Sequence, residues 1–191
     1  MAAGSSELGV AGLRRLRRAA LLLDGPSSAA RRSPDEIVTW FGAMQAQDLA
    51  SGHWSFGVRN LTLTDADVQR ATEDRRILRT WPMRGTVHFV PPADARWMLE
   101  LVGVRALAGA PRRREHLGLD EATVDRAAAV LGEALTGGGR MTRAECVDAL
   151  VRAGIGAARE HAYHFLWYAA QIGVTCIGPQ QGKEVFHGRI I

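Results

Sequence analysis

Two glutamines separated by one alanine form an unusual polar segment, Met44-Gln45-Ala46-Gln47-Asp48. A glutamine side chain does not titrate, so neither residue can serve as an ordinary general base. Its carboxamide oxygen can accept a hydrogen bond from water while its NH₂ group donates one, which suits the orientation of an attacking water. The same pattern also fits the polar end of an apolar helix, and Asp48 is either a source of negative field or a helix-end residue.

The motifs of several common enzyme classes are missing. The sequence contains no Walker A loop, no His-Glu-x-x-His, no Gly-x-Ser-x-Gly and no Cys-x-x-Cys. His161 and His164 have a spacing that could hold a metal, but no convincing third ligand accompanies them; core or surface positions and nucleic-acid contact are the other interpretations. Cys146 and Cys176 are too few for a disulfide framework or a four-ligand zinc site, so we expect buried thiols. The sequence therefore predicts neither a metal nor another cofactor.

Composition and charge narrow the class of protein. The chain has 191 residues, of which 47% are hydrophobic and 23% charged, as in ordinary globular proteins. Its formal net charge is +4, and clustered arginines supply all the basic residues except Lys183. Such clusters fit phosphate binding, and they equally fit solvated helix faces paired with acidic residues. No stretch approaches the ~18 apolar residues of a membrane span, and the run from Ala19 to Leu23 is too short for a secretory signal. We expect a cytoplasmic monomer without membrane contact.

Helix-start signals and apolar periodicity predict which segments of the first half of the chain form helices. The sequence predicts a helix over 8–23, a second from the capping box at Ser33 through Met44, and a third from Thr64 to about Asp74. Two β-rich runs follow, Ile77–Trp81 and Thr86–Val90, separated by proline and glycine. They predict a hairpin.

The second half repeats this order. The predicted elements are a connecting helix from Pro91 through Val102, an arginine-rich segment over 111–115, helices over 120–135, 142–152 and 159–171, and a hairpin of strands 174–177 and 183–187. Three helices closed by a two-stranded wing are the winged-helix plan, a helix-turn-helix variant whose last helix enters the major groove.

We therefore expect a mainly α fold with short β-hairpins, built as tandem winged-helix units. The first unit covers residues 1–92 and contains the two glutamines. A connecting helix and basic linker cover 93–118, and the second unit covers 119–191. The first unit has a longer gap between its second and third helices than the second unit has.

The Gln45-Ala46-Gln47 segment, the tract from Trp81 to Val90 and the tandem winged helices together resemble the AlkZ/YcaQ-type winged-helix DNA glycosylases. In that family Gln-x-Gln or Gln-x-Asp, with an aliphatic middle residue, is the catalytic signature, and this chain is similar to the Gln-x-Gln branch. The resemblance covers roughly residues 8–191. Family members are longer, so it concerns their N-terminal portion, and we expect their third winged helix and C-terminal β-barrel to be absent here.

The resemblance implies a hydrolase that cleaves the N-glycosidic bond of N7-alkylated purines in double-stranded DNA. It also implies unhooking of interstrand crosslinks and self-resistance to alkylating natural products of the azinomycin type. Gln45 and Gln47 would be catalytic. An N7-alkylated guanine is already cationic and leaves without protonation, so the two amides would orient water beside C1′ and favour the developing positive charge.

Five further residues are candidates for holding alkylated or crosslinked duplex DNA. Arg79, Arg84 and His88 lie on or beside the first predicted wing, and Arg159 and His161 lie early in the last predicted helix. A surface arginine and a strand-packed histidine are the alternatives, and the five tryptophans are expected in the core. The alternative functions are a non-catalytic winged-helix DNA-binding protein, a truncated family fragment, or a winged-helix module that binds protein.

Overall fold

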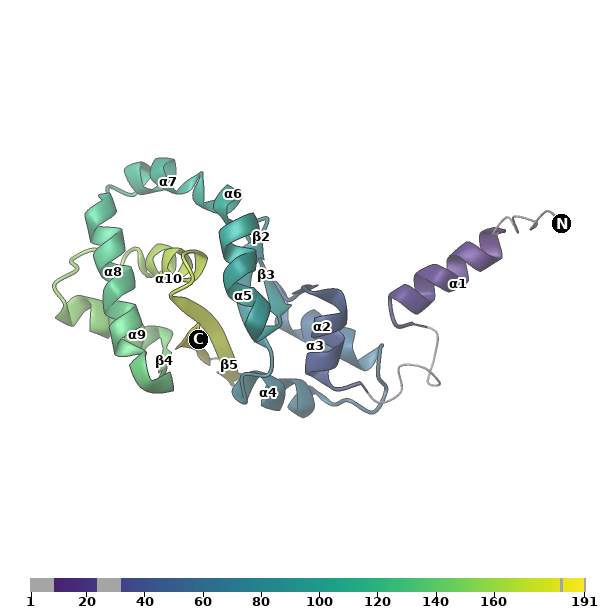
Figure 1. Cartoon of the computed structure of the whole chain (residues 1–191). Helices are drawn as coiled ribbons and strands as arrows, with labels where there is room; N and C mark the ends of the chain where they lie inside the picture. The colour runs from purple at the N-terminus through teal and green to yellow at the C-terminus, as the bar shows by residue number, and fades with distance from the viewer. Residues whose placement is uncertain (1–8, 24–31, 183, 191) are drawn as a thin grey trace.

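The computed structural model describes residues 9–23, 32–182 and 184–190 (Figure 1). The first half contains α1 (Val10–Ala20), α2 (Pro34–Phe41), β1 (Met44–Gln45), α3 (Leu49–Gly57), α4 (Asp65–Glu73), β2 (Leu78–Met83) and β3 (Thr86–Val90). The connection contains α5 (Pro92–Met98), the π-helical segment η1 (Leu99–Gly103), α6 (Val104–Leu107) and α7 (Ala110–His116). The second half contains α8 (Glu121–Ala134), the 3₁₀ turn η2 (Thr136–Gly138), β4 (Arg140–Thr142), α9 (Arg143–Arg152), α10 (Ala162–Gln171), β5 (Thr175–Gln181) and β6 (Glu184–Arg189).

The described strands form one six-stranded antiparallel sheet in the order β1-β3-β2-β5-β6-β4. The fold is mixed, with many helices and this sheet, whereas the sequence predicted a mainly helical fold with two separate short hairpins. Instead β2 and β5 pair antiparallel through Arg79 and Ile177, so that the two hairpins become neighbours in a single sheet. This pairing joins the first half of the chain to the second.

The order helix, strand, helix, helix, strand, strand occurs twice, from α2 to β3 and from α8 to β6. Each half contributes three neighbouring strands, with the second strand of its hairpin in the middle. The sequence analysis took the helix over 8–23 as the first of three, but α1 stands outside this repeated order. The long gap expected between the second and third helices holds α3, which the sequence analysis missed.

The capping box predicted at Ser33 is confirmed, and the helix starts predicted at Thr64 and at residue 142 are capping boxes too. Ser33, Thr64 and Thr142 each accept a hydrogen bond from the backbone N–H three residues later, and the acidic side chain at that position accepts one in return from the backbone of the capping residue. These reciprocal bonds satisfy N–H groups that an isolated helix end leaves unpaired. They explain why α2, α4 and α9 begin where the sequence says.

The end of α2 differs from the expectation that this helix continues through Met44. Gly42 has a positive φ of 70°, which ends the helix, and Met44 and Gln45 then pair as strand β1 with Phe89 and His88 of β3. Glycine adopts this left-handed conformation without steric cost. The two-residue strand is too short to leave a period-2 pattern in the sequence.

The two hairpins turn differently. In the first, Arg84 and Gly85 both have positive φ, 57° and 68°, as a two-residue type I′ turn requires. In the second, the expected turn over 178–182 is mostly strand, since β5 continues to Gln181 with a register shift between Ile177 and Gln180.

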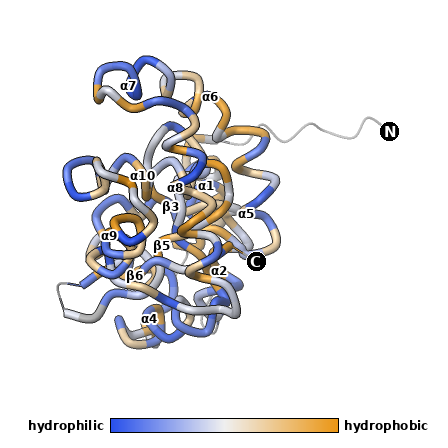
Figure 2. Tube along the Cα trace, turned by 90° about the vertical axis from the view of Figure 1, so that its left-hand side faces the viewer, coloured by the Kyte–Doolittle hydropathy of each residue, from blue (hydrophilic) through white to orange (hydrophobic). Residues whose placement is uncertain are grey.

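Helices cover the sheet on both faces. One apolar cluster joins α2, α3 and α4 to the first hairpin, a second joins α8, α9 and α10, and a third lies between α5 and the sheet. α7, which carries the arginine-rich segment, and the neighbouring α6 lie at one end of the molecule away from the strands (Figure 2). α1 meets α2 where the Trp40 indole donates to the Ala20 carbonyl at 2.9 Å.

Candidate functional site

The two glutamines are both exposed, whereas Ala46 between them is fully buried. Alternate residues of an extended chain point to the same side, so burial of Ala46 turns both amides outward. α3 passes directly over the alanine, because a Cβ added to Gly52 would lie 3.3 Å from the Ala46 Cα and 3.4 Å from its Cβ. A small apolar residue is therefore needed at the middle position.

Backbone and side-chain hydrogen bonds fix the segment on the edge of the sheet. The Ala46 N–H donates to the Val87 carbonyl at 2.8 Å, and the Val87 N–H donates to the Gln47 Oε1 at 3.0 Å. The Gln47 amide thus adds one hydrogen bond to those that pair β1 with β3. Its oxygen keeps a second lone pair and its NH₂ group keeps its donors.

His88 is the cross-strand partner of Gln45, and Thr80 faces it from β2. Cross-strand partners point to the same face, so the imidazole lies beside the base of the Gln45 side chain. The Nδ1 of His88 lies 2.9 Å from the Thr86 carbonyl oxygen, and 9% of the residue is exposed. Burial, followed by the nearby charge of Arg84, lowers the pKa of His88. The ring is therefore neutral at pH 7.

Arg79 approaches the glutamine segment from the opposite face of the sheet. It pairs with Phe89, and its guanidinium lies 5.7 Å from the centre of that ring. Its Nη2 donates to the Ala46 carbonyl at 3.3 Å. Arg79 is only 7% exposed, and burial lowers its pKa to about 10. Its described contacts hold the backbone between the two glutamines.

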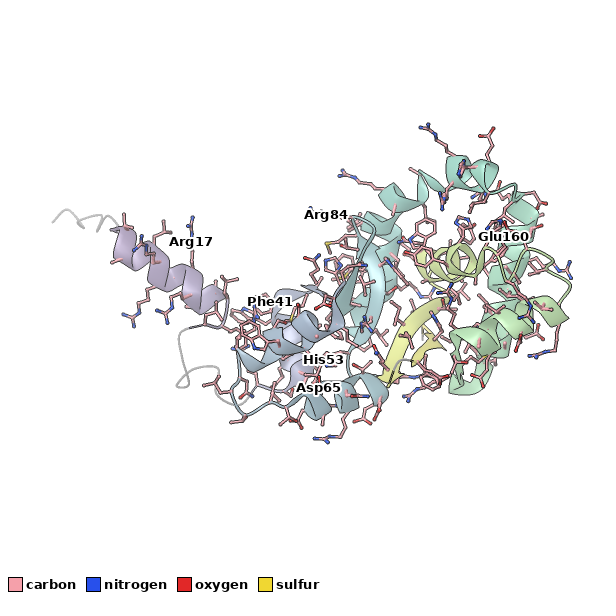
Figure 3. All side chains as sticks on the ribbon, turned by 180° about the vertical axis from the view of Figure 1, so that it is seen from behind. Arg17, Phe41, His53, Asp65, Arg84 and Glu160 are labelled. Carbon is pink, nitrogen blue, oxygen red and sulfur yellow. The ribbon has the colours of Figure 1, made fainter. Side chains whose placement is uncertain are left out.

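Arg84 occupies the tip of the first hairpin and is exposed, next to the strand that carries His88 (Figure 3). A guanidinium on such a turn is free to reach a ligand lying across the hairpin. The structure therefore brings Gln45, Gln47, His88 and Arg84 together at one end of the sheet.

Arg159 and His161 belong to the second half and precede α10, so the prediction that the helix begins at residue 159 was wrong. The Arg159 Nη2 donates to Asp148 at 3.3 Å, and the His161 Nε2 lies 3.8 Å from a Glu160 oxygen. Glu160 appears well away from Arg84 in Figure 3. These two residues form a separate group from the glutamines.

Asp48 is the N-cap of α3, since its Oδ1 accepts from the Ser51 N–H at 2.8 Å. Asp48 thus begins a helix that was not expected, instead of ending the preceding one, since α2 ends at Phe41. Hydrogen bonds from Ser51 lower the Asp48 pKa. Its carboxylate is thus committed to the backbone of α3.

A pocket of about 320 Å³ lies behind the glutamine segment, between α3, α4 and β5. Arg79 lines it, together with His53 and Asp65, whose Nδ1 and Oδ1 are 2.5 Å apart. The sequence analysis did not single out this pair, because the two residues come from different helices and share no motif. Figure 3 shows them together near α4.

Within the described ranges, no group of three or more His, Cys, Asp or Glu side chains is arranged to hold a metal ion. His164 is buried in α10 and stacks on Trp167 with ring centres 5.8 Å apart. Cys146 and Cys176 are buried and free, as expected, and burial raises the pKa of their thiols to about 12 and about 11. In the same ranges, no helix has the length and apolar character to cross a membrane.

The tryptophans do not all lie in the core, as had been expected. Trp81 is buried, but Trp40, Trp54 and Trp97 are 52%, 73% and 46% exposed. Trp40 gains a polar partner at its indole and the guanidinium of Arg32 at 4.7 Å from its ring centre. Such contacts allow a large aromatic side chain to remain at the surface.

Comparisons with known proteins add to this geometry. A family model described as DNA glycosylase AlkZ-like matches residues 38–189. The interstrand DNA cross-link repair glycosylase of Streptomyces sahachiroi is 27% identical over 168 residues, which make up 80% of this chain and 42% of that protein. The solved structure of Streptomyces sahachiroi DNA glycosylase AlkZ has the same fold, with a TM-score of 0.75 at 24% identity over 91% of this chain and 47% of its own. The chain therefore spans less than half the length of these relatives.

Proposed function

Because this chain belongs to the AlkZ-like DNA glycosylase family, we propose that it hydrolyses the N-glycosidic bond of N7-alkylated purines in duplex DNA. The proposal extends to interstrand crosslinks, since the Streptomyces sahachiroi relative is named as a cross-link repair glycosylase. One observation carries it. Gln45 and Gln47 are both exposed on the edge of the sheet while Ala46 anchors the backbone between them.

The chemistry suits an uncharged pair of amides. Alkylation at N7 makes the guanine a cation that leaves as a neutral base, so no general acid is required. What remains is to place a water against C1′ and to favour the oxocarbenium-like sugar. The second lone pair of the Gln47 oxygen can accept one hydrogen of that water, and the NH₂ group of the free Gln45 amide can donate to the water oxygen. Neutral amides are also too weak to release undamaged bases, which supports selectivity for primed lesions.

DNA contacts are part of the proposal. Arg84 projects from the hairpin tip next to the glutamines, where it can enter a groove or pair with phosphate. Arg159 and His161 would hold a second stretch of the duplex. His88 would meet the DNA beside Gln45, and Arg79 would act from below by holding Ala46.

The repeated element order supports winged-helix units within residues 1–92 and 119–191, joined by the connection over 93–118. In each, the last helix and the hairpin would face DNA. Binding through several phosphates should weaken with salt by about 0.9 log units per contact for each tenfold rise in salt.

An excision assay tests the proposal. Duplex DNA containing N7-methylguanine is incubated with the chain, and the released base is quantified by mass spectrometry. We expect release by the wild type and a loss of about 100-fold or more in Gln45→Ala and in Gln47→Ala, the usual cost of removing one preorganised polar group from a transition state. Gln69→Ala is the matched control, because the Gln69 amide on α4 bonds the Gln180 carbonyl instead.

Undiminished release in both glutamine variants would reject the catalytic role. Salt-sensitive DNA binding with no release by the wild type would favour a non-catalytic DNA-binding protein.

A further inference from the structure

His88 holds its imidazole in one tautomer. The Nδ1 is 2.9 Å from the Thr86 carbonyl oxygen, and a carbonyl oxygen can only accept. Nδ1 therefore carries the hydrogen in the neutral ring, and Nε2 carries a lone pair. A backbone acceptor of this kind commonly fixes the orientation of a histidine.

The ring lies next to the proposed site of hydrolysis. His88 pairs with Gln45 across the ladder between β1 and β3, and the following residue, Phe89, points into the opposite face and packs on Phe56 with ring centres 5.3 Å apart. His88 thus shares the face of Gln45, where 9% of it remains exposed. Neither Gln45 nor Gln47 can accept a proton from water, so this site lacks a base unless a third residue supplies one.

The groups around His88 keep it uncharged. Gln45 from β1 and Thr80 from β2 face it and carry no charge. On the same face of the sheet, α5 and η1 pack against Leu78 and Val90 through apolar side chains, and the charged residues of α5 and η1 do not contribute to the pKa shift of His88. The charged neighbour is Arg84 in the hairpin turn, which together with burial lowers the pKa of His88. A neutral base suits a cationic lesion, because a protonated imidazole would repel both the alkylated base and the developing sugar cation.

We propose that His88 is the general base of the reaction, accepting at Nε2 a proton of the water that Gln45 and Gln47 orient. This inference rests on the proposed function. The oxygen of the water forms a bond to C1′ as the bond from C1′ to N9 breaks, and its electron pair stays with the base. The N7-alkylated guanine departs neutral, and the positive charge it carried ends on the imidazolium.

Two acidic groups close to the glutamine segment are committed elsewhere. The Asp48 carboxylate caps α3, and the Asp65 carboxylate bonds His53 at the pocket on the covered face. The guanidinium of Arg84 carries only N–H donors and offers no acceptor. His88 is therefore the described residue at this end of the sheet that offers a free lone pair on a titratable nitrogen.

His88→Asn is the informative variant. The asparagine NH₂ group takes the place of Nδ1 and can still donate to Thr86, whereas nothing replaces Nε2. We expect its single-turnover excision rate on N7-methylguanine duplex to fall by about 100-fold, the lower end of what a general base contributes, with a much smaller loss of duplex affinity and an unchanged melting temperature. His116→Asn, at the exposed end of α7, is the matched control and keeps the wild-type rate.

The pH profile separates a base from a residue that only supports the fold. The wild-type rate should fall about tenfold per unit of pH below the His88 pKa, while His88→Asn should show no such limb. A nitrogen-15 spectrum of the wild type should show the hydrogen on Nδ1.

An active wild type with an unchanged rate and pH profile in His88→Asn would overturn the inference and leave the proposed function standing, as would a spectrum with the hydrogen on Nε2. Absence of excision by the wild type would instead reject the proposed function itself, and the role of His88 with it.

Discussion

Ala46 decides how the two glutamines are presented, although it carries no functional group. Its methyl group fits beneath α3 only because Gly52 has no side chain. The amides on either side are then forced outward together. At the residue scale, packing requires an aliphatic residue in the middle of the Gln-x-Gln pattern. The two glutamines are exposed because that middle residue is buried.

A side chain at Gly52 should therefore disturb the site from behind. Its Cβ would lie 3.2 Å from the Phe89 Cε2 and 3.3 Å from the Ala46 Cα, both in the packed core. We expect Gly52→Val to lower the unfolding free energy by about 1–3 kcal/mol, the usual cost of overpacking, and to reduce excision more than duplex binding. Chemical denaturation and single-turnover kinetics measure the two effects. Gly57→Val on the same helix has open space around its Cβ and controls for helix propensity. Equal effects of both substitutions would contradict the packing account.

At the element scale, β1 is a two-residue edge strand that relies on bonds from outside itself. Val87 supplies the ladder on one side, and the buried Arg79 binds the Ala46 carbonyl from the other face. Burial of a guanidinium lowers the free energy of unfolding unless the group forms hydrogen bonds. The burial of Arg79 therefore fixes the geometry of the backbone at Ala46 in place of giving maximal stability. The sequence pointed to Arg79 as a DNA contact because side-chain direction within a strand depends on a register that the sequence does not reveal.

A buried histidine on β6 determines how stability should depend on pH. His187 is 7% exposed, and burial, followed by the charge of Arg143, lowers its pKa to about 4. As pH falls below the unfolded value of 6.5, the unfolded chain binds a proton that the folded chain does not, so stability declines until about pH 4. The contribution lost over this interval is about 3 kcal/mol.

Urea unfolding at pH 7 and pH 4.5 measures this dependence. His187→Gln should show a much smaller fall in unfolding free energy than the wild type, since its side chain does not titrate. The remaining fall reports on His88 and His164, whose pKa values are also lowered by burial. The same fall in variant and wild type would refute the assignment to His187.

Short-range sequence patterns explain which helices could be predicted from the sequence. The capping boxes at Ser33, Thr64 and Thr142 each marked a true helix start, because the bonds involved lie within four residues of one another. α3 was not predicted, because its N-cap, Asp48, lies inside the glutamine segment and because two glycines interrupt its apolar pattern. The three helices expected in the first unit therefore included α1 and left out α3.

At the scale of the whole molecule, two copies of one element order share a sheet, and Ala170 and Ile177 of the second half pack into the apolar cluster of the first. The repeat was visible in the sequence, but the pairing of β2 with β5 was not, because it joins residues about a hundred positions apart with no local signature. The Gln-x-Gln segment was recognisable from its resemblance to a family. Its hydrogen bond to Val87 and its neighbour His88 required the fold.

If two uncharged amides favour a cationic sugar, the protein should bind a mimic of that sugar more tightly than undamaged DNA. A duplex containing a 1-azadeoxyribose, whose ring nitrogen is protonated at neutral pH, imitates the oxocarbenium-like sugar. We predict that the wild type binds this duplex at least about 100-fold more tightly than an undamaged duplex of the same sequence, and that Gln45→Ala combined with Gln47→Ala loses this preference. Equal affinity of the wild type for the two duplexes, or an undiminished preference in the double variant, would contradict the account.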